Sequence, residues 1–134
     1  MDTKYNEATL NRPKGERVLD APFLLMDIPA FSEQLLEEKA WQENERNGIT
    51  VFKGKNLTIF ITMLKTGAKI KDSPQTDILV AYLLKGEAKF TTNDQEEIMV
   101  KENQSIVFHK GMLNCIEAVS EATIMMHSYE QKNA

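Results

Sequence analysis

The stretch that decides the fold runs from Gly67 to Gly86 and reads GAKIKDSPQTDILVAYLLKG. Its second half, Ile78 to Leu84, is apolar at every position, so both faces of the strand that it predicts must be covered. The interior of a β-structure can cover one face, and a helix or a second subunit can cover the other. The glycine at each end is typical of a tight turn, where a positive φ is often required.

The strand pattern continues on both sides of this stretch. Apolar runs recur about every eight to twelve residues and are separated by turn residues, which is typical of an all-β sandwich or barrel. The predicted strands are residues 49–53, 57–64, 68–71, 78–84, 87–92, 97–100, 105–109, 113–119 and 122–129.

The N-terminal part of the chain has a different pattern. Residues 1–17 are polar and interrupted by proline and glycine, and we expect a flexible arm there. The short apolar run 23–26 is a candidate edge strand. Asp27 followed by Pro29 is typical of a helix start, and apolar residues then fall on one face of a helix at about residues 29–40.

A second stretch, residues 103–118, reads NQSIVFHKGMLNCIEA. Together with Gly67 to Gly86 it resembles the two signature motifs of the cupin superfamily, and Gly67, Gly86 and Gly111 fall at motif positions. The resemblance implies an all-β fold, the cupin-like double-stranded β-helix or jelly-roll barrel. The residue pattern adds one N-terminal amphipathic helix in front of it.

The metal-binding positions of these motifs have lost their ligands. Where the family has two histidines and a glutamate, this chain has Ser73, Gln75 and Leu79, and the histidine of the second motif is Asn114. None of these side chains offers the imidazole, carboxylate or thiolate that iron, manganese, nickel or zinc sites use. We therefore expect no bound metal and no other cofactor, and no metal-dependent dioxygenase or isomerase activity.

The motif register also predicts which side chains face the barrel interior. These are Ser73, Gln75, Leu79, Ala81, Leu83, Met112, Asn114, Ile116 and Ala118, joined by Ile59, Ile61 and Met63. The candidate ligand-binding residues among them are Ser73, Gln75, Asn114, Met112, Leu79, Ala81 and Ile116. Such a lining suits a small uncharged organic ligand. The alternative is that these side chains fill the interior and leave no cavity.

Chemistry without a metal would need a general base, and His127 is the candidate. If Met125 and His127 face inward, the imidazole enters the barrel. If Ile124 and Met126 face inward, it faces solvent, and the sequence leaves both arrangements open. His109 precedes a turn and is interpreted as a surface residue.

Four other reactive side chains have simpler interpretations. Tyr82 alternates with the inward residues of its strand and should point outward. Cys115 is interpreted as a small buried apolar residue rather than a nucleophile, because no base partner is visible to activate it. Asp72 and Asp77 are interpreted as caps of loops or turns rather than displaced metal ligands.

Composition narrows the class of protein. The chain has 134 residues, of which 42% are apolar and 27% are charged, as in soluble globular domains. We expect one domain at residues 18–134 after the arm, with the barrel at about 49–129. The net charge of −4 argues against nucleic acid and anionic membranes as partners, and the longest apolar runs are too short to span a bilayer.

The remaining expectations concern location, assembly and role. A single cysteine and a polar N-terminus without an apolar leader favour the cytoplasm. The doubly apolar strand and the N-terminal arm favour a homodimer. The sequence favours a metal-free small-molecule binding or structural module. The alternative is a metal-independent isomerase, epimerase or lyase acting on a small carbonyl or sugar substrate.

Overall fold

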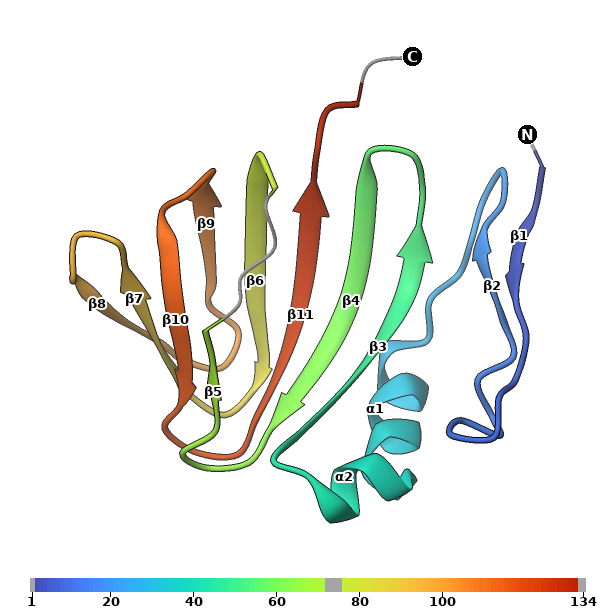
Figure 1. Ribbon diagram of the computed structural model, residues 1–134, viewed down its shortest axis with the longest axis horizontal. Coiled ribbons are helices and arrows are strands. Elements are labelled where there is room, and N and C mark those ends of the chain that lie inside the picture. The colour runs from blue at the N-terminus through green and yellow to red at the C-terminus, as the bar shows by residue number, and fades with distance from the viewer. Residues whose placement is uncertain (1, 72–75, 133–134) are drawn as a thin grey trace.

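The computed structural model describes residues 2–71 and 76–132 (Figure 1). In chain order its elements are β1 (Lys4–Asn6), β2 (Arg17–Asp20), α1 (Ile28–Glu37), α2 (Lys39–Glu43), β3 (Arg46–Lys53), β4 (Leu57–Leu64), β5 (Lys69–Ile70), β6 (Ile78–Lys85), β7 (Ala88–Thr92), β8 (Glu97–Val100), β9 (Ser105–His109), β10 (Leu113–Ala118) and β11 (Ala122–Tyr129).

The main strands form two antiparallel sheets that face each other (Figure 1). The larger sheet has the order β3-β4-β11-β6-β9, and the smaller has the order β5-β10-β7-β8. Strands distant in the chain are neighbours in both sheets, since β11 lies between β4 and β6 and β10 lies between β5 and β7. The predicted all-β jelly roll is confirmed, and each strand predicted from residue 49 onward is present with small differences at its ends.

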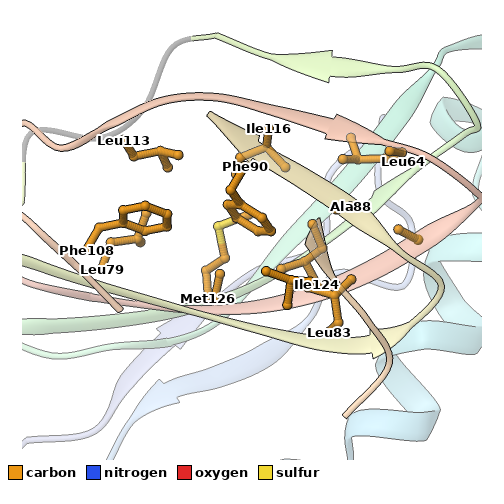
Figure 2. Packing of buried hydrophobic residues seen from close by; sticks show 14 of the residues in the cluster. Leu64, Leu79, Leu83, Ala88, Phe90, Phe108, Leu113, Ile116, Ile124 and Met126 are labelled. Carbon is orange, nitrogen blue, oxygen red and sulfur yellow. The ribbon is translucent and has the colours of Figure 1, made fainter. Parts of the chain in front are cut away.

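The main core fills the space between the sheets. Leu79, Ala81 and Leu83 of β6 point into it, as predicted from alternation, and all three are buried. Phe90 of the smaller sheet stacks on Phe108 of the larger one, with ring centroids 5.8 Å apart (Figure 2). This packing joins the sheets through apolar contact across the sandwich.

A second apolar cluster lies on the opposite face of β3 and β4, under the two helices (Figure 1). Leu35 and Trp41 from the helices pack there. Ile59, Ile61 and Met63 also belong to this cluster, so the prediction that they face the barrel interior is wrong. Every second residue of β4 meets the helices, and the alternating set that includes Phe60 meets the main core.

The predicted single helix is two helices. Asp27 caps α1 as expected, because its side chain accepts a hydrogen bond from the backbone N–H of Ala30 at 3.1 Å. The helical run breaks at Glu38, whose backbone is extended (φ −73°, ψ 146°). No helix in the described residues is long and apolar enough to cross a membrane.

The break at Glu38 coincides with an ion pair. Arg12 donates two hydrogen bonds from Nε and one from Nη2 to the Glu38 carboxylate at 2.9–3.1 Å, and Asn47 donates another at 3.1 Å. Burial alone would raise the pKa of Glu38, but hydrogen bonds from Arg12, Asn47 and Gln34 bring it below its usual value. Glu38 is therefore held as a carboxylate at the junction of the helices.

The segment predicted as a flexible arm has regular structure and specific contacts. β1 pairs with β2, and Lys4 Nζ donates a hydrogen bond to the Lys53 carbonyl at 3.1 Å. Arg17 Nε donates to the Thr50 carbonyl at 2.7 Å, which attaches β2 beside β3. Residues 23–26, the candidate edge strand, form no strand in the structure.

The turn glycines behave as the sequence predicts. Gly86 has φ +79°, and a side chain there would meet the Glu121 carbonyl oxygen at 2.2 Å. Gly67 has φ +85° but has open space around it. Gly86 thus combines a backbone conformation that favours glycine with close approach of a second chain segment, whereas Gly67 has only the first constraint.

This contrast gives a matched pair of variants. We expect Gly67→Ala to lower the free energy of unfolding by about 1 kcal/mol, the cost of a left-handed residue with a side chain. Gly86→Ala should cost about 1–3 kcal/mol more, because the neighbouring backbone must also move. Urea denaturation followed by circular dichroism measures both values. Equal losses would contradict the close contact at Gly86.

Candidate ligand cavity

A cavity of about 390 Å³ opens between the two sheets. It lies on the inner faces of β3, β4, β6 and β11 and of the opposing strands β5 and β10. Its lining comprises Arg46, Asn47, Gly48, Phe60, Thr62, Ile70, Leu79, Leu113, Ile116 and Met126.

Residue size explains why the space is not filled. Gly48 of β3 lies opposite Thr62 of β4 in the register, so two small residues are paired at this end of the larger sheet. Elsewhere between the sheets, the stacked rings of Phe90 and Phe108 fill the interior (Figure 2). The cavity therefore lies beside a pair of small residues on β3 and β4.

The lining is apolar apart from one end. Asn47 lies there, but its amide is already engaged, donating to the Leu35 carbonyl at 3.0 Å and to Glu38 at 3.1 Å. Thr62 contributes a hydroxyl group and Arg46 a guanidinium group. A molecule in this cavity would meet mainly hydrocarbon, with polar groups at the β3 end.

The structure brings only part of the predicted ligand-binding set to the cavity. Leu79 and Ile116 line it. Ala81 is buried in the adjoining core but does not line the cavity. Ser73 and Gln75 lie outside the described residues.

Met112 and Asn114 are exposed, so the prediction that they face inward is wrong. The reason is an irregularity in the pairing of β10 with β7 between Leu113 and Cys115. An extra residue in one strand reverses the alternation of faces. Leu113 and Ile116 consequently both point into the cavity, and Asn114 between them points out.

Sequence reasoning missed the contributions of β4 and β11. Phe60 and Thr62 line the cavity instead of their neighbours Ile59 and Ile61. β4 is apolar at most positions, so its alternation does not reveal which face is inward. The amphipathic helix needed an apolar surface to cover, and assigning it to β4 would have identified the inward set.

The residues at this site do not fit the metal centre that the resemblance would imply. Leu79 presents hydrocarbon to the cavity, and Asn114 points away from it. Among the described residues there is no cluster of three or more histidine, cysteine, aspartate or glutamate side chains that could hold a metal ion. Within residues 2–71 and 76–132, the donor groups required by a transition metal are not gathered at the cavity.

His127 lies on the opposite face of the larger sheet from the cavity. Ile124 and Met126 are the inward residues of β11, which decides between the two arrangements left open by the sequence. The register places His127 between Ile59 of β4 and Val80 of β6. The ring is half-buried, and within the described structure its buried Nδ1 atom has no hydrogen-bond partner. Burial lowers the pKa of His127.

The other reactive side chains considered above also lie away from the cavity. Tyr82 points outward as predicted, and its hydroxyl donates to Asn103 Oδ1 at 3.0 Å. His109 is exposed and Cys115 is half-buried. Asp77 accepts a hydrogen bond from the backbone N–H of Gln131 at 2.8 Å, in agreement with its interpretation as a loop cap. Asp72 lies outside the described residues.

The burial of His127 predicts a pH dependence of stability. An unfolded histidine titrates near about 6.5, and the pKa of His127 is lower in the folded protein. Between these values the unfolded chain binds more protons, so the free energy of unfolding rises with pH. We expect stability to fall between about pH 7.5 and about pH 5, and part of this loss to disappear in His127→Gln.

The exposed His109 provides the control. His109→Gln should retain the wild-type difference between the two pH values, measured by urea denaturation at each. If His127→Gln loses as much stability on acidification as the wild type, desolvation of this ring does not contribute to the pH dependence.

Comparisons with known proteins identify the fold. No family model matches the sequence, and no curated protein matches it. Among solved structures, a cupin superfamily protein from Desulfitobacterium hafniense superposes with a TM-score of 0.61 at 11% identity, covering 66% of this chain and 80% of that one. A conserved protein of unknown function from Streptococcus pyogenes superposes with a TM-score of 0.65 at 20% identity, covering 85% and 92%.

An enzyme is also among the structural neighbours. Salicylate 1,2-dioxygenase from Pseudoaminobacter salicylatoxidans gives a TM-score of 0.64 at 14% identity over 75% of this chain and 31% of the enzyme. Identities this low establish a shared fold and leave the activity open.

Proposed function

Because the chain has the cupin fold, we propose that it is a metal-free binding module that holds a small, largely apolar organic molecule between its sheets. The observation that carries this proposal is the cavity lining. It is mainly hydrocarbon, and among the described residues it includes no carboxylate, imidazole, thiol or phenol. The proposal keeps the cytoplasmic location expected from the sequence.

The size and chemistry of the cavity support a ligand of this class. Binding sites for small molecules typically have volumes of about 300–1,000 Å³, apolar walls and a few polar groups that orient the ligand. This cavity has about 390 Å³, and Thr62 and Arg46 lie at one end of it. Burying an apolar molecule there would release water from both surfaces, which favours binding.

A metal-independent isomerase, epimerase or lyase is less well supported. Each of these reactions needs a group that accepts a proton from the substrate. His127, the candidate base, lies on the opposite face of the larger sheet, and Tyr82 points outward. The described part of the cavity therefore supports binding better than proton transfer.

The binding proposal can be tested with N-phenyl-1-naphthylamine, an uncharged dye whose fluorescence rises in apolar surroundings. We expect saturable fluorescence with the wild type and at least a tenfold weaker Kd with Ile116→Phe, which fills the cavity, since about 1.4 kcal/mol corresponds to tenfold. Met126→Phe is a second filling variant.

Met99→Phe is the matched control, because Met99 is 43% exposed and lies outside the cavity. It should bind the dye as the wild type does, and circular dichroism checks that all variants are folded. Wild-type protein that binds no dye, or folded filling variants that bind it equally well, would argue for a filled core or another site.

The metal-free part of the proposal has a separate test. Protein expressed without a tag and analysed for metals should carry well under one equivalent of iron, manganese, nickel or zinc, because the described part of the cavity lining has no donors suited to them. Treatment with EDTA should leave the thermal midpoint unchanged. A stoichiometric metal that is lost together with stability on chelation would contradict this assignment.

A further inference from the structure

A second hollow lies outside the barrel, against the segment that joins β2 to α1 (Figure 1). We call it the outer hollow. It has a volume of about 420 Å³ and is lined by Asp20, Ala21, Pro22, Phe23, Leu24, Met26, Phe52, Leu57 and Ile59. None of these residues lines the cavity between the sheets, so the two spaces are separate.

One charged group faces this apolar space. Asp20, the last residue of β2, is the polar side chain among the described lining residues and is only 8% exposed. Within the described structure its carboxylate has no hydrogen-bond or ion-pair partner. A carboxylate removed from water is unfavourable unless a donor or a cation meets it. A cation that entered the outer hollow would supply this missing partner.

An aromatic ring lies next to the carboxylate. A Cβ atom placed on Gly54 would lie 3.6 Å from Asp20 Oδ2 and 2.9 Å from Phe52 Cζ. The carboxylate and the ring of Phe52 therefore approach the same point at one end of the outer hollow. A carboxylate provides charge for an organic ammonium ion, and an aromatic ring provides a cation–π contact for it. The two groups together fit a cation better than a neutral ligand.

An irregularity in β3 directs Phe52 to the outer hollow. Thr50 pairs with Phe60, which faces the cavity between the sheets, so simple alternation would turn Phe52 to that side as well. The register shifts between Thr50 and Phe52, and Phe52 instead pairs with Ile59, which lines the outer hollow. Strand bulges redirect side chains in this way and are common beside functional sites.

Lys4 is the cation that the strand register places opposite Asp20. Its Nζ atom donates a hydrogen bond to the Lys53 carbonyl at 3.1 Å, and the described residues contain no ion pair between Lys4 and Asp20. The lysine is exposed to solvent and directed to the main chain of β3. The position next to the carboxylate is therefore open to a ligand.

We propose that the outer hollow is a second binding site, and that its ligand is a small organic ammonium ion, a protonated amine on an apolar or aromatic body. The ammonium group meets Asp20 beside Phe52, and the body of the ligand packs on Leu57 and Ile59. A volume of about 420 Å³ suits a small molecule. Alkylamines are protonated near neutral pH, as lysine is with a pKa of about 10.4. This inference is independent of what the cavity between the sheets binds.

The first test compares three ligands of similar shape and different charge. 2-Phenylethylammonium chloride carries the proposed cation, 2-phenylethanol is uncharged, and 3-phenylpropionate is an anion. Isothermal titration calorimetry with the wild type should show saturable binding of the ammonium ion. The other two compounds should bind at least tenfold more weakly, because neither offers a positive charge to Asp20.

The second test changes the site itself. Asp20→Asn keeps the shape of the side chain and removes its charge, so it should weaken binding of 2-phenylethylammonium at least tenfold. Phe52→Leu removes the ring and should weaken binding by about two- to fivefold. Asp94→Asn is the matched control, because it makes the same change at an exposed carboxylate between β7 and β8. Ile116→Phe fills the separate cavity between the sheets, and both of these variants should bind as the wild type does.

The thermal midpoint gives a readout that a purely structural role of Asp20 would not reproduce. Asp20→Asn should have a midpoint equal to or above that of the wild type, because it removes a buried charge without a partner. Added 2-phenylethylammonium should raise the midpoint of the wild type and leave that of Asp20→Asn unchanged. Circular dichroism measures each midpoint and checks that each variant is folded.

Four outcomes would overturn the proposal. The first is no binding of 2-phenylethylammonium at about 10 mM, which exceeds the Kd of even a weak site, and the second is equal binding of 2-phenylethanol. The third is unchanged affinity in folded Asp20→Asn, and loss of binding in Ile116→Phe would then place the amine between the sheets. The fourth is a lower midpoint in both Asp20→Asn and Lys4→Met, which would identify Lys4 as the partner of the carboxylate.

Discussion

The structure depends on burying both faces of the larger sheet. Its inner face packs against the smaller sheet through contacts such as the stacked rings of Phe90 and Phe108. Its outer face is covered by α1 and α2 over β3 and β4. The cavity lies between the sheets, so the binding proposal follows from the way the inner face of this sheet is packed.

The fold could be predicted from the sequence because its signals are local. Gly67, Gly86 and Gly111 adopt the positive φ that their turns require, and the apolar runs between such turns became strands. The cavity could be predicted only in part, because the direction of a side chain depends on pairing with another strand. The irregularity in β10 turns the side chain of Asn114 from the inner to the outer face of its strand. Strand β4 is apolar on both faces, so its sequence does not show which residues pack against the helices. The N-terminal contacts were missed because they join Arg12 and Arg17 to residues far along the chain.

The cavity shows how one fold can serve different chemistry. The structural neighbours include a dioxygenase, yet Leu79 in this chain presents a hydrocarbon side chain where the cupin motif has a carboxylate. The irregularity in β10 has a similar effect, since it turns Asn114 outward and gives its place to Leu113. A substitution and a shift of strand register both make the interior more apolar. The position that would hold an ion becomes suited to excluding water.

The contact between Arg12 and Glu38 gives the first residues of the chain a specific mechanical role. Glu38 interrupts the helical run and is only 11% exposed, and three hydrogen bonds from one guanidinium group reach its carboxylate. The same guanidinium group donates to the Gly48 carbonyl at 2.7 Å, next to the cavity lining. Through Arg12, the N-terminal segment thus connects the junction between α1 and α2 to strand β3. Proteolytic removal of this segment would leave the largely buried Glu38 carboxylate without its counterion. It would also remove the hydrogen bond to the Gly48 carbonyl and so weaken the attachment of β3, which lines the cavity.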